Sequence, residues 1–218
     1  MPLTDSPLLV RLFNRWHGSR TLRSGPGHQV FSTNARLRGT RIEFYGRDGV
    51  VELGRDVRLF DCSITLRGTA PRLVIGAGTR LRNVRIVVED RGSRLPIGPS
   101  TSMTGAVLQA KEGGLVEFGA DCMVGGGAEV NNSDSHSLLD AATGARLNPA
   151  RDVILGDHVW LGAGVWVSKG ARIGPGTVVA ARSRVSGELP AGVLAAGSPA
   201  VVKRTGVTWD RRRLGAEP

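Results

Sequence analysis

Residues 153–185 read VILGDHVWLGAGVWVSKGARIGPGTVVAARSRV, and this stretch decides the fold. An aliphatic residue recurs at every sixth position: Leu155, Leu161, Val167, Ile173, Val179 and Val185. The residue after each of these is small, and the residue two before it is small or β-branched. A period of six that is sustained in this way is typical of a solenoid.

The geometry of a strand explains the pattern. Residues two apart on a strand point to the same side, so each hexad supplies one large and one small inward residue. A bend follows every short strand, and successive coils then pair as parallel strands about 4.8 Å apart. We therefore expect an all-β chain that forms a single-stranded parallel β-helix. Spacing alone leaves the hand and the number of hexads per coil open.

Composition agrees with a narrow interior. The chain has 218 residues, of which 5% are aromatic and 31 are Gly, so small and aliphatic side chains must fill the core. Cys62 and Cys122 make neither a disulfide framework nor a cysteine-based zinc site. The sequence contains no run of 18 apolar residues and no recognisable signal peptide, so we expect a cytoplasmic protein.

The net charge of +10 raises the question of nucleic-acid binding. The basic residues are nearly all Arg and are scattered, as in TRLRNVRIVVED at residues 79–90, where they alternate with apolar residues. That alternation is typical of a strand with one solvated face. We therefore expect no nucleic-acid partner.

The repeat extends upstream in pieces that differ in phase. Members of these pieces are Leu53 and Leu59; Ile75, Leu81 and Val87; and Phe118, Val124 and Val130. The phase changes predict loops at residues 61–69, 89–114 and 137–151, and loops on a rigid scaffold are where binding chemistry concentrates.

The ends of the chain differ from the middle. Residues 1–28 are expected to form a short amphipathic helix and a linker, and residues 29–200 the β-helix. Residues 201–218 are basic and are expected to end loosely. The N-terminal helix is expected to cap the solenoid; contact with a membrane is possible but is not indicated.

His136 is the candidate catalytic residue. It follows Val130 by six positions, where a core aliphatic residue belongs, and the sequence leaves the repeat immediately after it. A His at the mouth of a loop can act as a general base, because it titrates near neutral pH. Asp134 is expected to orient the imidazole, to bind substrate hydroxyls, or to serve as a turn residue; these three roles stay open. The alternative for His136 is a hydrogen-bonded structural histidine.

No other catalytic set is present in the sequence. His17, His28 and His158 are interpreted as surface residues. A nucleophile elbow, a P-loop and a dinucleotide fingerprint are absent, and no third ligand joins His136 and His158 for zinc. We therefore expect no metal.

The sequence resembles the hexapeptide-repeat acyltransferases, and within them the capsular and O-antigen polysaccharide O-acetyltransferases. The resemblance covers about residues 40–205 and depends on NNSDSHSLLDAATGARLNP at residues 131–149, the hexads, and ELPAGVLAAGSPAVVKR at residues 188–204. It implies a left-handed β-helix with three hexads per coil, a homotrimer, and sites shared between neighbouring subunits. It also implies acetyl-CoA as the acyl donor, a sugar or glycan as the acceptor, and His136 as the general base.

The resemblance assigns further residues to binding. The predicted cofactor-binding residues are Trp160, Ala163, Ala181, Ser186, Arg182, Arg184, Lys203 and Arg204, and the predicted substrate-binding residues are Asn131, Asn132 and Asp134. Two basic positions of the family are lost here, at Gly187 and Val201, which leaves the grip on the 3′-phosphate to other residues. Arg182, Arg184 and Lys203 are the candidates to replace them, since Arg binds phosphate well.

Two other functions remain open. One is N-acetylation of an amino sugar or a small acceptor, which the choice of acceptor would separate from O-acetylation. The other is a non-catalytic β-helical scaffold, against which the loop that carries His136 argues.

Overall fold

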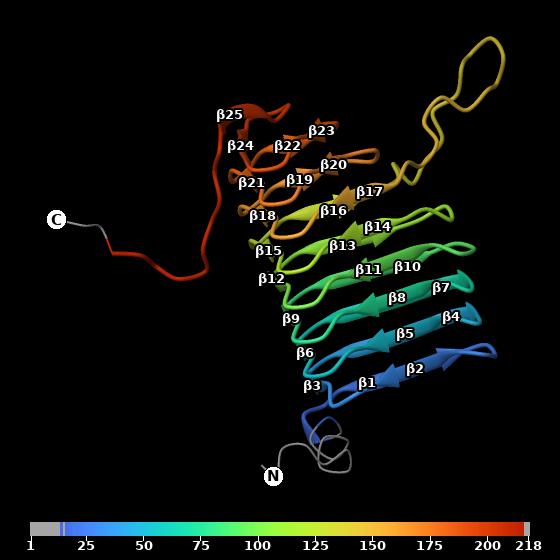
Figure 1. Cartoon of the computed structure of the whole chain (residues 1–218). Helices are drawn as coiled ribbons and strands as arrows, with labels where there is room; N and C mark the ends of the chain where they lie inside the picture. The colour runs from blue at the N-terminus through green and yellow to red at the C-terminus, as the bar shows by residue number, and fades with distance from the viewer. Residues whose placement is uncertain (1–13, 15, 216–218) are drawn as a thin grey trace.

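The structure is a computed structural model that describes residues 14 and 16–215; most of the predicted N-terminal helix lies outside them. Figure 1 shows one tall solenoid whose coils rise from the N-terminal to the C-terminal end. Its strands fall into three sheets that form the three faces of a prism, with eight, eight and nine strands. The fold is therefore the expected parallel β-helix.

Each coil contributes one strand to each sheet, and all neighbours pair in parallel except the last pair of sheet C. Sheet A consists of β1 (Arg20–Ser24), β4 (Arg41–Arg47), β7 (Ser63–Thr69), β10 (Arg85–Glu89), β13 (Val107–Ala110), β16 (Glu129–Asn131), β19 (Trp166–Val167) and β22 (Arg184–Val185). Sheet B consists of β2 (Gln29–Ser32), β5 (Val50–Leu53), β8 (Arg72–Ile75), β11 (Arg94–Ile97), β14 (Val116–Phe118), β17 (Val153–Leu155), β20 (Arg172–Ile173) and β23 (Glu188–Leu189). Sheet C consists of β3 (Arg36–Arg38), β6 (Arg58–Phe60), β9 (Arg80–Arg82), β12 (Ser102–Thr104), β15 (Met123–Val124), β18 (Trp160–Leu161), β21 (Val178–Val179), β24 (Val193–Ala196) and β25 (Val201–Thr205).

The six aliphatic residues that define the repeat are all buried, as predicted. Each is the inward residue of one short strand, and each stacks on its counterpart in the next coil, as Leu161 does on Val179. The small or β-branched residues two positions earlier are also buried, from Val153 to Ser183. The core is therefore a stack of thin aliphatic layers along the axis of the solenoid.

Two of the three predicted loops are wrong. The segment at 61–69 contains β7, and the segment at 89–114 contains β11, β12 and β13, so both belong to the solenoid. The phase changes because the N-terminal coils are longer: Arg36 pairs with Arg58, 22 residues on, whereas Trp160 pairs with Val178, 18 residues on. An even number of extra residues keeps the inward and outward alternation and lengthens the strands of sheet A instead.

The corners of the prism restrict which residues can lie between the strands. At the corner between sheets B and C, Asp121 and His158 have φ values of 53° and 55°, and Gly176 takes the same place one coil later. Gly125 lies at another corner, where an added Cβ would meet the backbone nitrogen of Ala163 at 2.7 Å. Tight stacking of the coils thus excludes side chains at such positions.

Both ends of the described chain differ from expectation. Part of the predicted linker forms β1, which pairs along its length with β4, so the solenoid begins at Arg20. The basic tail does not end loosely at once, because β25 pairs antiparallel with β24 and covers the edge of sheet C. The unpaired edge of a solenoid is a site of aggregation, and β25 covers β24 at that edge of sheet C.

Cys62 and Cys122 are buried free thiols, and burial raises the pKa of Cys122 to about 11. Among the described residues no helix has the length and apolar character needed to cross a membrane.

Candidate active site

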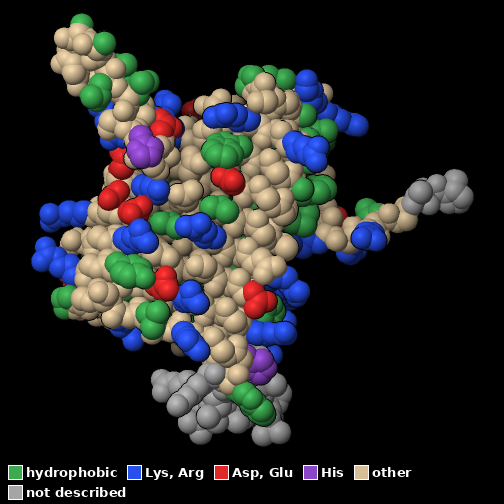
Figure 2. Space-filling model, turned by 180° about the vertical axis from the view of Figure 1, so that it is seen from behind, with side chains coloured by type: hydrophobic (Ala, Val, Ile, Leu, Met, Phe, Trp, Pro, Cys, Tyr) green, Lys and Arg blue, Asp and Glu red, His purple; other side chains and the backbone are tan. Residues whose placement is uncertain are grey.

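The third predicted loop is confirmed. Residues 132–152 leave the solenoid between β16 and β17, at the corner between sheets A and B, and stand clear of the body (Figures 1 and 2). The loop folds back on itself, with an antiparallel bridge between Leu139 and Arg146. Three leucines on it are more than half exposed: Leu138, Leu139 and Leu147.

Asn132 fixes the start of this loop. Its side chain is fully buried, and its amide makes two hydrogen bonds to the backbone of Lys111 in the coil below. The Lys111 nitrogen donates to Oδ1 at 2.8 Å, and Nδ2 donates to the Lys111 oxygen at 2.9 Å. The backbone oxygen of Asn132 accepts a hydrogen bond from the backbone nitrogen of Arg151, at the point where the loop returns to the solenoid. The predicted substrate-binding role of Asn132 is therefore corrected: its amide is already used to close the loop.

Two ion pairs hold the same loop against the body. Arg146 donates to Glu112 at 2.6 Å, and together with a bond from Ser133 this lowers the pKa of Glu112 to about 2. Lys169 donates to the Asp134 carboxylate at 2.5 Å, and Asn148 donates to the same oxygen at 2.7 Å. Lys169 is the main reason that the pKa of Asp134 lies below its usual value.

His136 lies just beyond this anchored base. Its side chain is exposed, so the expectation that it occupies a core position is wrong: the inward alternation ends with Val130 and buried Asn132. Its backbone oxygen accepts a hydrogen bond from Asn148 at 2.9 Å, which fixes the chain at this point. Within the described residues the imidazole has no hydrogen bond to Asp134, whose carboxylate is engaged by Lys169 and Asn148. The ring is thus free to meet a ligand.

A polar groove of about 350 Å³ lies beside the base of the loop. Its lining joins sheet A to the loop and consists of Gln109, Glu129, Asn131, Ser133, Asp134, Ser135, Trp166, Ser168 and Arg184. The Arg184 guanidinium lies 5.8 Å from the centre of the Trp166 ring. The hydroxyl of Ser168 is buried and has no hydrogen-bond partner within the part of the chain described.

Known proteins with similar sequences include two polysialic acid O-acetyltransferases. No protein-family model matches the chain. A polysialic acid O-acetyltransferase from Neisseria meningitidis is 30% identical over 132 residues, which are 60% of this chain and 60% of the relative. A second one, from Escherichia coli, is 27% identical over 125 residues, which are 57% of this chain and 41% of the relative. The match therefore spans less than two thirds of the length of either relative.

The solved structures extend the likeness to nearly the whole chain. The polysialic acid O-acetyltransferase OatWY has a TM-score of 0.73 at 27% identity, over 91% of this chain and 94% of that one. The chain is similar to known sugar O-acetyltransferases. The polysialic-acid-specific acetyltransferase NeuO has a TM-score of 0.81 at 24% identity, over 92% of both chains, and this likeness shows the fold. The left-handed β-helix of the hexapeptide-repeat family is confirmed.

Three of the predicted cofactor residues, Trp160, Ala163 and Ala181, lie at the other edge of sheet A from the loop. Trp160 is exposed on β18 in sheet C, and Ala163 and Ala181 occupy successive corners between sheets C and A. The Arg182 nitrogen donates to the Ala163 oxygen at 2.8 Å, which stacks these corners directly. The loop with His136 leaves from the corner between sheets A and B. One protomer therefore does not bring the two sets together.

The predicted phosphate-binding residues are all exposed but do not form one cluster. Arg184 and Arg182 lie on or beside sheet A, and Ser186 follows at the corner between sheets A and B. Lys203 and Arg204 lie on β25, where Arg204 pairs with Leu194 of sheet C. Arg184 is shared with the polar groove, which its assignment to the cofactor did not anticipate.

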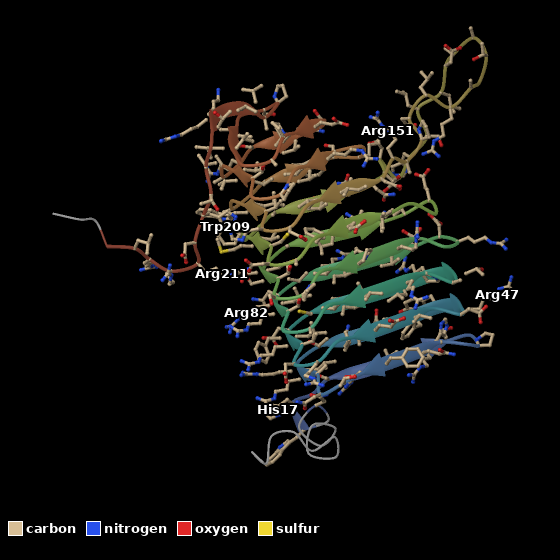
Figure 3. The ribbon with its side chains drawn as sticks, in the orientation of Figure 1. His17, Arg47, Arg82, Arg151, Trp209 and Arg211 are labelled. Carbon is tan, nitrogen blue, oxygen red and sulfur yellow. The ribbon has the colours of Figure 1, made fainter. Side chains whose placement is uncertain are left out.

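His158, at the corner between β17 and β18, holds the C-terminal tail in place. Its ring stacks on Trp209 with centroids 4.1 Å apart, and its Nδ1 lies 2.8 Å from Asp121. The Trp209 indole donates to the His158 oxygen at 2.7 Å, and Arg211 pairs with Asp121 at 2.9 Å. Figure 3 shows Trp209 and Arg211 on the same side of the solenoid. The tail is thus clamped onto sheet C.

Several site residues were not found from the sequence. Lys169, Glu112 and Lys111 anchor the loop, and Trp166 lines the groove. Lys169 and Trp166 stand at outward positions of the hexads, where the periodicity gives no signal. Glu112 and Lys111 lie a full coil below the loop, so only the stacking of coils brings them to it.

Proposed function

We propose that this protein transfers the acetyl group of acetyl-CoA to a hydroxyl of a sugar or glycan, with His136 as the general base. The polar groove beside the anchored loop supports this most strongly. It offers Asn131 and Asp134 to sugar hydroxyls, and Trp166 as an apolar face for a ring. The relatives named above are polysialic acid O-acetyltransferases, which agrees with a glycan acceptor.

The reaction needs little beyond positioning. His136 takes the proton of the acceptor hydroxyl while that oxygen attacks the thioester carbonyl carbon. The tetrahedral oxyanion needs one or two backbone N–H donors, and it collapses with cleavage of the carbon–sulfur bond. The thiolate of CoA then takes the proton back from His136. Holding acceptor and donor together supplies much of the rest of the rate.

Asp134 acts in this proposal as a substrate-binding residue rather than as the partner of His136. Its carboxylate is held by Lys169 and Asn148 and keeps a low pKa, so it stays a hydrogen-bond acceptor for sugar hydroxyls. The bond between Asn148 and the His136 oxygen fixes the backbone from which the imidazole projects.

We also propose that the active form is a homotrimer. The loop and the predicted pantetheine-binding residues Trp160, Ala163 and Ala181 stand at opposite edges of sheet A, so a site that two protomers share accounts for both. The exposed leucines of the loop offer apolar surface for such a contact, as Figure 2 shows for the loop tip. Replacing Leu138, Leu139 and Leu147 together by Asp should yield an inactive monomer in a sizing-column assay; an active monomer would contradict the shared site.

In the donor site we place Trp160, Ala163 and Ala181 along pantetheine, with the backbone of the stacked corners as its hydrogen-bond partner. Arg182, Arg184, Lys203 and Arg204 are the candidates for the phosphates, since Gly187 and Val201 supply no charge. No metal is required, and no group of three His, Cys, Asp or Glu among the described residues could hold one. The dependence on acetyl-CoA favours a cytoplasmic location.

The deciding experiment incubates the purified protein with acetyl-CoA and a panel of nucleotide sugars and polysaccharides and follows the released thiol. We expect release with acceptors that carry hydroxyls and no amine. Release with amino sugars alone would favour N-acetylation. A protein that neither releases thiol nor gains thermal stability with CoA would be a β-helical scaffold.

A further inference from the structure

The three faces of the solenoid differ sharply in charge. The strands of sheets A and B each carry three glutamates: Glu43, Glu89 and Glu129 on sheet A, and Glu52, Glu117 and Glu188 on sheet B. The nine described strands of sheet C carry neither Asp nor Glu, but they carry seven basic residues: Arg36, Arg38, Arg58, Arg80, Arg82, Lys203 and Arg204. The strands of this face therefore carry only positive charge.

Three of these arginines form a ladder. Arg36 pairs in register with Arg58, and Arg58 with Arg80, on adjacent parallel strands. They point outward, because the middle residue of each strand, such as Leu59, is buried. Adjacent strands are about 4.8 Å apart, so three guanidinium groups line one column. Arg38 and Arg82 flank this arginine ladder on the same strands.

The ladder has no acidic partner within the described residues. On the other faces, Arg41 pairs with Glu43 at 3.7 Å and Arg67 with Glu89 at 3.9 Å, and Arg72 pairs with Glu52. No such ion pair involves Arg36, Arg58 or Arg80. Like charges directly opposite each other on neighbouring strands are destabilising. Because no ion pair offsets this repulsion, the three guanidinium groups are available to an anionic ligand.

The same column leads toward the proposed donor site. Beyond Arg80 it continues through Ser102 and Met123 to Trp160, five strands from Arg36, which is about 24 Å at the usual spacing of strands. Arg211 from the tail donates to Ser102 at 2.6 Å, although Asp121 already neutralises it. Figure 3 shows Arg82, Arg211 and Trp209 along this one side, with Arg47 and Arg151 on the other.

We propose that the arginine ladder binds a carboxylate-bearing polysaccharide and holds the acceptor polymer along sheet C, away from the groove in which acetyl transfer occurs. Guanidinium groups bind carboxylates in two-pronged hydrogen bonds, and a row of them suits a polymer with a repeated carboxylate. The proposal rests on the proposed function for the identity of the polymer as the acceptor.

The surroundings favour a glycan over nucleic acid. Proteins that hold single strands stack the bases on exposed aromatic rings. On β3, β6 and β9 the one aromatic residue is Phe60, which is half-buried and lies under the Arg82 guanidinium, 5.7 Å from its ring centre. The ladder thus offers charge without a stacking platform.

The test measures binding to the intact protein without acetyl-CoA, so it does not depend on catalysis. The probes are polysialic acid, polygalacturonic acid, neutral dextran, and single- and double-stranded DNA. The ladder variant is Arg36→Gln/Arg58→Gln/Arg80→Gln. The control variant is Arg41→Gln/Arg67→Gln/Arg72→Gln, which removes the same charge from sheets A and B.

We expect the two acidic glycans to bind and dextran not to bind. The ladder variant should bind the glycans roughly tenfold more weakly, with a slope of log affinity against log salt reduced by about 2 to 3. The control should bind like the wild type, and the ladder variant should melt no lower than the wild type, since its arginines have no partners to lose.

Three outcomes would overturn the proposal: equal weakening in both variants, no glycan binding at all, or tighter ladder-dependent binding of DNA than of either glycan. Acetyl transfer to a short acceptor is measured in parallel. Absence of polymer binding by the wild type with intact transfer defeats only the ladder, and absence of transfer by the wild type with intact polymer binding defeats only the proposed function.

Discussion

The anchor of the catalytic loop can be tested through Asn132. Replacing Asn132 by Ala removes the hydrogen-bond partners of two backbone groups of Lys111. Its N–H loses the acceptor Oδ1 at 2.8 Å, and its carbonyl oxygen loses the donor Nδ2 at 2.9 Å. Each backbone group left unpaired costs about 1–3 kcal/mol, and because water can reach the half-buried Lys111 the lower part of that range applies. We expect the base of the loop to lose about 2–3 kcal/mol, which raises the population of its open state roughly 30- to 150-fold.

The assay is hydrogen exchange at the Lys111 and Arg151 amides, both of which bond to Asn132 in the wild type. Turnover should fall with the protection, because His136 follows Asn132 by four residues. The matched control is Thr101→Val. Thr101 is also buried and also bonds two backbone groups, of Gly119 and Cys122, but it lies away from the loop. Unchanged protection in the Asn132→Ala protein, or equal loss in the control, would refute the reasoning.

The variant Asn132→Asp tests whether the stability of the loop depends on pH in the expected direction. The introduced carboxyl faces the Lys111 carbonyl oxygen, so the protonated form, which can donate, is favoured in the folded loop. Its pKa is therefore raised on folding, and the stability that it contributes is present at low pH and lost as the pH rises. Protection of the loop in this variant should recover on acidification. Protection that is independent of pH would show that the amide hydrogen of Asn132 does not matter.

Three further predictions concern the loop and the stacking of coils. Glu112 has a pKa of about 2 in the folded loop against a usual value of 4.5, so it stabilises the loop above pH 4.5, and this stabilisation is lost as the pH falls from 4.5 toward 2. Limited proteolysis should show the wild-type loop opening across that pH window. A Glu112→Gln loop that still opened there would disprove the role of Glu112. Lys169→Met should raise the pKa of Asp134 and raise the KM for the glycan acceptor about tenfold or less, since one exposed ion pair is worth about 1 kcal/mol at most; an unchanged KM would remove Asp134 from the acceptor site. Gly125→Ala should lower the melting temperature, because the new Cβ would lie 2.7 Å from the Ala163 nitrogen. The control Gly187→Ala should leave the melting temperature unchanged, because its new Cβ meets nothing within 4 Å. Equal melting temperatures for the two variants would contradict the tight stacking at the Gly125 corner.

The sequence predicts the fold well because the repeat is a local property. Each hexad places its own inward residue, and Leu155 to Val185 lie where the spacing puts them. The two upstream loops are mispredicted because a change in the phase of the repeat does not require an inserted loop. The longer coils keep the alternation while they shift the phase, and only the pairing of Arg36 with Arg58 shows that 22 residues make one coil.

The site was predictable only in part. His136 and Asp134 stand out because the repeat stops beside them, and the structure places both at the base of the protruding loop. Their contacts were not readable, because Lys169 and Asn148 reach Asp134 across 35 and 14 residues of sequence. The tail clamp between His158 and Trp209 spans 51 residues and joins two segments that share no pattern. Contacts made by the stacking of coils leave no periodic trace.

The central claim is most directly tested by the turnover number for acetyl transfer in His136→Ala, with the oligomeric state checked on a sizing column and His28→Ala as the control at the far end of the solenoid. General base catalysis contributes about 10²- to 10⁴-fold, so the His136 variant should lose at least about two orders of magnitude while the assembly and the control activity stay intact. Transfer at near wild-type rate by the His136 variant would show that another group takes the proton.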